Sequence, residues 1–270
     1  MHRVSRDHPP LTVLRAFGVK GPARPLAGGQ GTSWAAEDLV FKPDGGPLHE
    51  WLAGALADVT PDGFRLAMPV CTRDGAWVVE GWSATRCVQG SEPDYSAVST
   101  WREILTAGRA LHQALAHLDR PAFPDTRRDW WARADKAAWG ERAIRFLPEF
   151  AAPARRLQGA LEPLGRPQIV HADLTNNVLF APGLPPAIID ISLYWRPPPY
   201  AEGIVVADAL CWHDAPASLW ETVDVSPAAV ARALLFRMAT TNERVACGAE
   251  GIDLQDEARR YGLAAAAIGL

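Results

Sequence analysis

The sequence predicts an α+β protein of two lobes, a small antiparallel-sheet lobe with one helix and a larger, mainly helical lobe. Three observations indicate this division. Short strand-like segments fill roughly the first ninety residues, helical periodicity dominates the remainder, and a polar strand–loop–strand segment interrupts the helices. We therefore expect an N-terminal lobe over residues 1–85 and a C-terminal lobe over residues 86–270.

The N-terminal segments have the pattern of strands separated by turns. Glycine, proline and Asp-Gly pairs such as Asp74-Gly75 divide them. The predicted strands are LTVLRAF, ARPLAGG, SWAA, DLVFK, FRLAMPV and AWVVEGW. Residues 47–59 differ, because their apolar residues recur at helical intervals and Pro47 suits the first turn of a helix.

Helical periodicity begins after a short connection near residues 80–89. The predicted helices cover residues 96–118, 127–139, 142–161, 201–213, 226–246 and 254–268. Between them, the segments QIV, VLF and AIID alternate with tight loops and predict a hairpin of short strands.

Composition excludes several classes of protein. The 270 residues carry a net charge of −4 and no basic block, which argues against a nucleic-acid or membrane partner. The four cysteines form no C-x-x-C pair, so neither a zinc site nor a disulfide framework is indicated. No apolar run approaches the roughly 18 residues that span a bilayer. We expect a cytoplasmic protein with a small-molecule partner, and the sequence does not indicate its oligomeric state.

Polar residues gather in the hairpin segment IVHADLTNNVLFAPGLPPAIIDI, residues 169–191. Asp173 and Asn177 bracket the loop after one strand, and Asp190 ends a later strand, so a hairpin would bring all three to one edge. Carboxylate and amide oxygens suit Mg²⁺, which shares its coordination with phosphate and water. Zinc would require nitrogen or sulfur ligands.

The stretch HADLTNNVLF followed by IID resembles the catalytic loop and metal-binding Asp of the kinase-like phosphotransferases, the aminoglycoside phosphotransferase and choline kinase branch. The resemblance implies a two-lobed protein kinase-like fold that uses ATP and Mg²⁺. It implies that Asp173 is the catalytic carboxylate that faces an acceptor hydroxyl, and that Asn177 and Asp190 hold Mg²⁺ on the nucleotide phosphates. His171 would fix the loop structurally.

The loop departs from the family pattern H-x-D-x-x-x-x-N at one point. Three residues instead of four separate Asp173 from Asn177. The alignment on Asn177 rests on the apolar triplet VLF that follows it directly, and Asn176 is the alternative ligand.

The resemblance also implies three features of the N-terminal lobe. In LAGGQGTSW, Gly28, Gly29 and Gly31 would form the turn over the phosphates; Lys42 of LVFK would bind phosphate, and Glu50 of the following helix would pair with it. Lys42 is one of only three lysines among 27 basic residues. A compact ammonium fits between phosphate oxygens where the planar fork of Arg would not.

The resemblance places the adenine site and the acceptor site less narrowly. Backbone groups near Glu80 and Trp82 in WVVEGW would bind adenine, and YWRPPPY would begin the acceptor segment. Acidic residues near the expected pocket, Glu202, Asp208 and Asp214, would suit a cationic acceptor, and Asp208 falls where relatives carry an Asp that braces the catalytic loop.

The predicted function is transfer of the γ-phosphate of ATP to a hydroxyl of a small molecule. The first alternative is a catalytically weak or inactive kinase-like protein that binds nucleotide and acts through a partner, which the short loop favours. The second is a metal-dependent hydrolase built on His171, Asp173 and Asp190, in which Lys42 and the glycines would have no functional role. Fold resemblance cannot choose the acceptor.

Overall fold

The computed structural model describes residues 8–26, 31–43, 46–122 and 126–270. The chain divides into two compact units. The N-terminal unit comprises residues 1–91 and 179–190, and the C-terminal unit comprises residues 92–178 and 191–270. A segment from the second half of the chain therefore belongs to the N-terminal unit, which the predicted division into residues 1–85 and 86–270 does not include.

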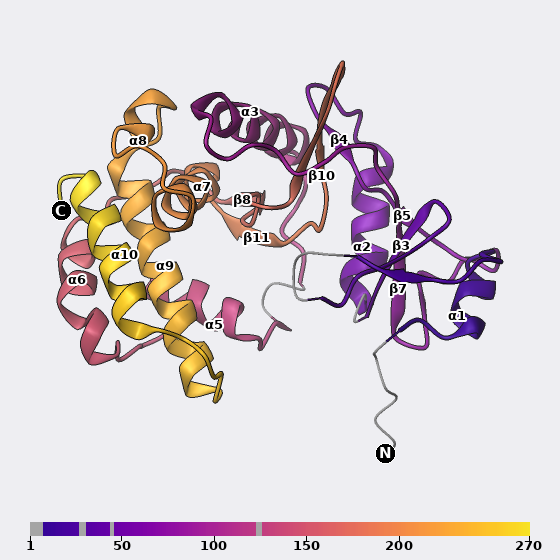
Figure 1. The fold of residues 1–270 in the computed structure, drawn as a ribbon, viewed down its shortest axis with the longest axis horizontal. Helices are drawn as coiled ribbons and strands as arrows, with labels where there is room; N and C mark the ends of the chain where they lie inside the picture. The colour runs from indigo at the N-terminus through magenta and orange to yellow at the C-terminus, as the bar shows by residue number, and fades with distance from the viewer. Residues whose placement is uncertain (1–7, 27–30, 44–45, 123–125) are drawn as a thin grey trace. The chain divides into compact units, whose positions relative to one another are not determined.

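An antiparallel sheet forms the larger part of the N-terminal unit (Figure 1). Its strands are β1 (Arg24–Pro25), β2 (Trp34–Ala36), β3 (Leu39–Pro43), β5 (Pro69–Val70), β6 (Val78–Val79) and β7 (Trp82–Arg86). Five follow the order β1-β2-β3-β7-β5, and β6 also pairs with β7. Five of the six predicted segments thus contribute to this sheet, although each strand is short.

The central strands β3 and β7 set the two faces of this sheet. Leu39 and Phe41 are buried in a hydrophobic cluster with Trp82 and Ala84. Successive side chains of a strand point to opposite faces, so Lys42 leaves the face that Phe41 buries. The register pairs Lys42 with Ser83, which anchors its backbone in the middle of the sheet.

One predicted strand is wrong, because residues 11–17 begin with a helix, α1 (Leu11–Ala16). Val13, Leu14 and Phe17 pack against the sheet cluster. Their spacing of one, three and four residues places them on one helical face, whereas a strand would direct Val13 and Leu14 to opposite sides. The tertiary contact overrides the strand propensity of the segment.

A second, three-stranded sheet of order β4-β10-β9 explains why residues 179–190 join the N-terminal unit. Its strands are β4 (Arg65–Leu66), β9 (Val178–Ala181) and β10 (Leu184–Ile188), and the helix α2 (Gly46–Ala57) precedes β4. Strands β4 and β10 pair in parallel, and the Ala67 N–H donates to the Ile188 carbonyl at 3.1 Å. Asp190 therefore follows a strand of the N-terminal unit.

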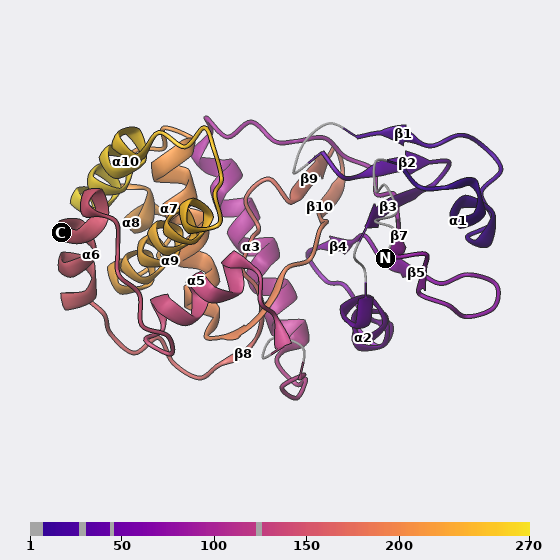
Figure 2. The ribbon, with the colours of Figure 1, turned by 90° about the horizontal axis from the view of Figure 1, so that it is seen from below.

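Helices dominate the C-terminal unit, as predicted. They are α3 (Val98–Leu115), α5 (Trp130–Ala138), α6 (Pro148–Gly159), α7 (Pro198–Trp212), α8 (Leu219–Thr222), α9 (Pro227–Ala246) and α10 (Leu254–Ala267). Helix α9 packs against α5, α6, α7 and α10, and Figures 1 and 2 both show it among these neighbours. Its central position follows from an apolar sequence that buries residues on nearly every side.

A two-stranded ribbon of β8 (Gln168–His171) and β11 (Leu193–Arg196) supports the polar loop of the C-terminal unit. The two strands are antiparallel, and His171 pairs with Leu193. The predicted hairpin had no strand after Asp190, so β11 is a feature that the sequence interpretation missed. Its partner lies across the polar segment, and local periodicity does not show such a pairing.

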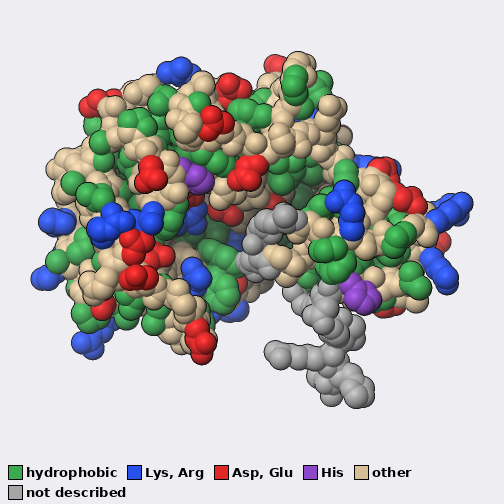
Figure 3. All heavy atoms as spheres, in the orientation of Figure 1, with side chains coloured by type: hydrophobic (Ala, Val, Ile, Leu, Met, Phe, Trp, Pro, Cys, Tyr) green, Lys and Arg blue, Asp and Glu red, His purple; other side chains and the backbone are tan. Residues whose placement is uncertain are grey.

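The surface carries no strong asymmetry of charge on the face shown in Figure 3, where acidic and basic side chains are interspersed over each unit. None of the helices in the described part of the chain is long and apolar enough to cross a bilayer.

Candidate functional site

The loop that carries Asp173 starts from a rigid base at His171. This histidine is completely buried, and its backbone N–H donates to Nε2 of His112 at 3.0 Å. The Ser192 N–H donates to Nδ1 of His171 at 3.3 Å, and the Ala172 N–H donates to the Ser192 carbonyl at 3.1 Å. These contacts hold both sides of the ribbon end together, one residue before Asp173.

Burial also keeps His112, which contacts the start of this loop, in its neutral form. His112 on α3 is buried, and burial together with the neighbouring His171 lowers its pKa to about 3. A neutral His112 presents Nε2 as the acceptor that the His171 N–H requires. The contact therefore depends on keeping His112 unprotonated.

Asn177 closes the loop onto Asp173. Its side-chain nitrogen Nδ2 donates to the Asp173 carbonyl at 2.7 Å and to the Asp173 carboxylate oxygen Oδ2 at 3.3 Å. Asn176 is exposed, has a φ of 64°, and contacts Tyr95 through its backbone N–H instead. The three-residue spacing thus still brings an Asn side chain onto Asp173, and that residue is Asn177.

A buried arginine from a distant helix reaches the same carboxylate. Arg237 of α9 donates through Nε and Nη2 to both oxygens of Asp208 on α7, at 2.7 and 2.5 Å. Its Nη2 also donates to Oδ1 of Asp173 at 3.3 Å. Burial lowers the pKa of Arg237, but the carboxylates of Asp208 and Asp173 outweigh this effect, so the guanidinium stays charged.

Sequence interpretation named Asp208 as a brace of the catalytic loop but missed Arg237, through which Asp208 acts on Asp173. A signal was present, because Arg237 stands alone between apolar residues in the segment ALLFRMA. A charged residue that is buried in a helix requires a partner of opposite charge. The sequence alone did not say which acid that partner would be.

The other predicted pair lies within the N-terminal unit. Lys42 Nζ on β3 lies 2.6 Å from Oδ2 of Asp190, and the two side chains are 34% and 52% exposed. Asp190 has a φ of 48°, so the chain turns sharply directly after β10. The ammonium and the carboxylate thus meet on an accessible surface, and both keep donor or acceptor capacity for a further ligand.

The remaining predicted residues of this unit differ in outcome. Gly31 has a φ of 69°, a conformation that favours glycine, whereas Gly28 and Gly29 lie outside the described residues. Glu50 on α2 is exposed, and no ion pair between it and Lys42 is found among the described residues. The expected pairing is corrected accordingly, since Lys42 contacts Asp190.

Glu80 and Trp82 occupy a different place from the one expected. Glu80 and Gly81, with φ of 50° and 79°, form the tight turn between β6 and β7. The Trp82 side chain is buried in the sheet cluster. The chain leaves the sheet only after Arg86, so β7 occupies part of the predicted connection at residues 80–89. The adenine site at Glu80 and Trp82 stays a prediction.

The donor groups of the expected metal ligands fit magnesium. Nδ2 of Asn177 is committed to Asp173, which leaves Oδ1 as an acceptor with no partner among the described residues. Asp190 contributes a half-exposed carboxylate. Within the described chain, no three His, Cys, Asp or Glu side chains form a group that could hold a metal ion. Magnesium commonly takes further ligands from phosphate and water, so either residue could serve as one ligand among several.

Comparison with solved structures assigns the chain to the protein kinase-like fold, with its antiparallel N-terminal sheet and largely helical C-terminal part. An aminoglycoside phosphotransferase from Alicyclobacillus acidocaldarius matches with a TM-score of 0.61 at 13% identity, over 97% of this chain and 93% of that one. A choline/ethanolamine kinase family protein from Mesorhizobium loti matches with a TM-score of 0.55 at 17% identity, over 94% and 90%.

A third matching structure contains bound ligands. A thermostable mutant of aminoglycoside phosphotransferase APH(4)-Ia, in a ternary complex with ADP and hygromycin B, matches with a TM-score of 0.58 at 14% identity, over 96% of this chain and 97% of that one. No protein-family model matches the sequence, and no curated protein matches it. Identities this low establish the fold and leave the activity to be argued from the residues.

Proposed function

We propose that the protein transfers the γ-phosphate of ATP to a hydroxyl group of a small molecule with the help of Mg²⁺. The observation that carries the proposal is the 2.6 Å contact between Lys42 and Asp190. Sequence resemblance gave these residues two separate tasks, phosphate binding and metal binding, and both tasks concern the same triphosphate. The complexes of APH(4)-Ia with ADP and with AMP-PNP support nucleotide as the ligand.

Lys42 would bind the α- and β-phosphates, because a compact ammonium can contact oxygens of both. Asn177 and Asp190 would hold Mg²⁺, and the bound ion would neutralise charge on the phosphate oxygens. Gly28, Gly29 and Gly31 would let the backbone approach the phosphates closely. In such a reaction the protein contributes mainly by positioning and charge stabilisation.

Asp173 would orient the acceptor hydroxyl and accept its proton. Its carboxylate is half-exposed, and contacts from Arg237 and Asn177 hold it by one oxygen each at 3.3 Å. These long contacts leave acceptor capacity on both oxygens. The carboxylate can therefore receive a hydroxyl proton without first breaking a bidentate ion pair.

Titration of Mg-ATP into the wild-type protein and Asp190→Ala tests the nucleotide site. We expect Asp190→Ala to weaken Mg-ATP binding by about tenfold or more, because it removes a metal ligand and a partner of Lys42. Asp62→Ala, which changes an exposed turn residue, serves as the control and should bind as the wild type does. Equal affinities for all three proteins would remove the proposed role of Asp190.

The catalytic assignment is tested by Asp173→Asn in a screen of small alcohols that follows ATP consumption. We expect Mg-ATP binding to persist and phosphotransfer to fall by about 10²-fold or more, because the amide cannot accept the proton. Unchanged turnover would refute the assignment.

A nucleotide-binding regulator without transfer activity is the second candidate. The short loop favours it, because three residues instead of four separate Asp173 from Asn177. Tight Mg-ATP binding together with no consumption of ATP for any acceptor would support the regulator over the enzyme.

A further inference from the structure

A polar cavity of about 30 Å³ lies within the C-terminal unit, between α5 and β11. Four cationic side chains and two acidic side chains line it: Arg120, Arg127, Lys136, Arg196, Asp135 and Glu141. The lining therefore has an excess of two positive charges. None of these residues belongs to the phosphate-binding or catalytic set described above.

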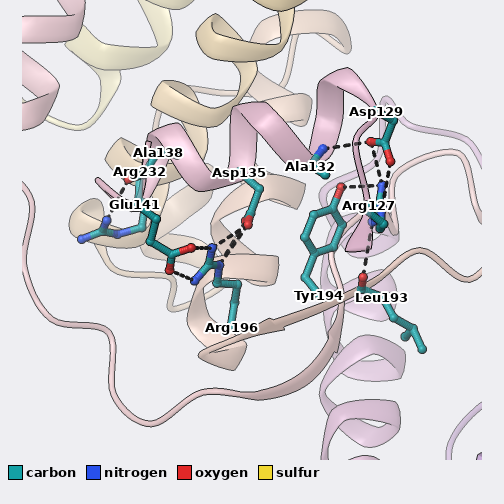
Figure 4. Close-up of polar contacts among 10 residues, drawn as sticks. All are labelled: Arg127, Asp129, Ala132, Asp135, Ala138, Glu141, Leu193, Tyr194, Arg196 and Arg232. Atoms are coloured by element: carbon teal, nitrogen blue, oxygen red, sulfur yellow. Dashed lines mark hydrogen bonds and ion pairs between the residues drawn. The ribbon is translucent and has the colours of Figure 1, made fainter. Parts of the chain in front are cut away.

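Both acids of the cavity contact the same arginine. Figure 4 shows Arg196 between Asp135, which projects from α5, and Glu141. Arg196 contacts Asp135 through Nη2 at 2.7 Å and Glu141 through Nη1 and Nη2 at 2.5 and 3.0 Å. The two carboxylates thus have a matched partner and are not available to attract a cationic ligand.

Arg127 forms another part of the lining and retains unused donor capacity. Its Nε and Nη2 donate to Asp129 at 2.9 and 3.1 Å, and its guanidinium lies 4.8 Å from the centre of the Tyr194 ring (Figure 4). By contrast, the one contact of Nη1 within the described part of the chain is with the Leu193 carbonyl, at 3.5 Å. Such a long contact leaves this nitrogen able to donate to a ligand oxygen.

Lys136 supplies the second available cation. No hydrogen bond or ion pair of its ammonium group is found in the described part of the chain, although the residue lines the cavity. It is also one of only three lysines in a sequence that otherwise uses arginine. A single compact ammonium at this position is suited to bind an anionic ligand.

A buried arginine next to the cavity strengthens its positive potential. Arg232 donates to the carbonyls of Ala138 and Glu162 at 2.9 and 3.3 Å and lies 4.1 Å from the Trp139 ring centre, with no carboxylate partner among the described residues. Arg196 lies over the same Trp139 ring at 4.9 Å. An anion in the cavity would therefore gain from a buried charge that the protein leaves uncompensated.

We propose that the cavity binds the carboxylate group of a small hydroxy acid and that this acid is the acceptor of the phosphotransfer, so the inference rests on the proposed function. The volume matches about two water molecules, at roughly 10–15 Å³ for each. The two oxygens of a carboxylate can replace these two waters. Lys136 and Nη1 of Arg127 are the donors that receive it.

The cavity and Asp173 are built on the same ribbon, which supports an acceptor that spans both. Leu193 of the cavity pairs with His171, two residues before Asp173. Tyr194 packs edge-on against Phe236, at 6.2 Å between ring centres, and the next residue, Arg237, contacts Asp173. An acid anchored at Lys136 would therefore lie on the ribbon that positions the proposed base.

Two of the three acids that suggested a cationic acceptor are paired with arginines. Glu202 contacts Arg109 at 2.5 Å, and Asp208 contacts Arg237 at 2.5 Å. Asp214, the third, is exposed. The pairing of Glu202 and Asp208 weakens the argument for a cationic acceptor and favours an acidic one.

The first test measures binding of lactate, glycerate and 3-hydroxybutyrate, and of their neutral amides, to the full chain without nucleotide by saturation-transfer NMR. We expect the acids to bind about tenfold more tightly than the amides, and Lys136→Met to remove this preference. Lys20→Met, which changes an exposed lysine of the N-terminal unit, is the matched control and should keep it. Lys136→Arg, which restores the charge, should keep most of it.

The second test follows phosphotransfer from ATP to the same compounds. We expect Lys136→Met to raise KM for the hydroxy acid about tenfold while kcat changes by less than about twofold, because the residue binds substrate without touching the reacting atoms. Equal binding of acids and amides, or preferred phosphorylation of amino alcohols, would overturn the acidic-acceptor inference and leave the phosphotransferase proposal standing. Lys136-dependent binding of the acids without any phosphotransfer would confirm the carboxylate site and overturn the proposed function.

Discussion

Two arginines of the C-terminal unit occupy similar positions, yet they hold their acids differently. Each is 13% exposed and lies between one buried and one half-exposed carboxylate. Arg196 links Asp135, 8% exposed, to Glu141, 49% exposed, and Arg237 links Asp208, 6% exposed, to Asp173, 46% exposed. The two clusters therefore have the same burial and the same composition of charges.

The two arginines differ in the number and length of their contacts with the exposed acid. Arg196 contacts both carboxylate oxygens of Glu141, at 2.5 and 3.0 Å, whereas Arg237 contacts a single oxygen of Asp173, at 3.3 Å. A two-point ion pair fixes the orientation of a carboxylate, whereas a single long contact stabilises its charge and leaves its orientation free. The first cluster therefore fixes the orientation of its exposed carboxylate, and the second leaves the Asp173 carboxylate less constrained.

The largest expected effects come from removing either arginine. Arg196→Met and Arg237→Met each leave a buried carboxylate without its partner, so we expect each to lower the free energy of unfolding by about 3–5 kcal/mol. Urea unfolding measures this change, and Arg259→Met, in an exposed pair with Asp256, should cost less than about 0.5 kcal/mol. A loss below about 1 kcal/mol for either buried arginine would show that its cluster is not a stabilising ion pair.

A substitution at Gly203, where α7 packs closely against α9, should affect the Arg237 cluster and not the Arg196 cluster. Asp208 lies on α7 and Arg237 on α9, and a Cβ added to Gly203 of α7 would lie 2.3 Å from the Ala229 carbonyl oxygen of α9. We expect Gly203→Ala to force these helices apart and to lower stability by about 1–3 kcal/mol. It should also reduce phosphotransfer, because Arg237 would move relative to Asp173.

The matched control is Gly262→Ala in α10, where an added Cβ meets nothing within 4 Å. This substitution should raise the free energy of unfolding by about 0.5–1 kcal/mol, since alanine favours the helix more than glycine does. If Gly203→Ala were as well tolerated as Gly262→Ala, the close approach of α7 and α9 would not govern the Arg237 cluster.

These clusters also show how far sequence interpretation reaches. Periodicity predicted the helices that carry Asp208, Arg237 and Asp135, because it depends on which face of each helix is buried. It could not pair those residues, since each ion pair joins elements that are distant in the chain. For the same reason it missed β11, which pairs with β8 across the polar segment.

The candidate site was predictable where a motif carried it and not elsewhere. The motif located Asp173 and Asn177, and their hydrogen bonds place them together. The helix at residues 11–16 was misread as a strand, because its β-branched and aromatic residues favour a strand locally while packing against the sheet decides the outcome. Likewise, nothing in the segment around Lys136 reveals a cavity, which is a property of three-dimensional packing.

The buried His112 beneath the Asp173 loop should make the stability of the protein sensitive to acid. Burial, with the neighbouring His171, lowers the pKa of His112 from 6.5 to about 3. Between these values the unfolded chain binds a proton at His112 and the folded chain does not, so stability falls as the pH decreases. The expected loss is about 1.4 kcal/mol for each pH unit below 6.5.

His112→Gln tests this pH dependence. Its side-chain oxygen can still accept from the His171 N–H, but the residue does not titrate. The difference in free energy of unfolding between the two proteins should therefore grow in favour of His112→Gln as the pH is lowered from 6.5 to 5. A constant difference over this range would contradict the burial of a neutral histidine beneath the loop.

The smallest expected effects on stability concern the two exposed acids, and they distinguish the fixed carboxylate of Glu141 from the less constrained carboxylate of Asp173. Glu141→Gln weakens a two-point contact at the surface and should cost about 0.5–1 kcal/mol, whereas Asp173→Asn weakens one long contact and should cost less than about 0.5 kcal/mol. The order reverses for phosphotransfer, which should survive Glu141→Gln and be lost in Asp173→Asn. Urea unfolding and ATP-dependent turnover, measured on both variants, give the comparison. A greater loss of stability in Asp173→Asn would mean that Arg237 holds this carboxylate as a structural pair, and the carboxylate would then be as poorly placed to accept a proton as that of Glu141.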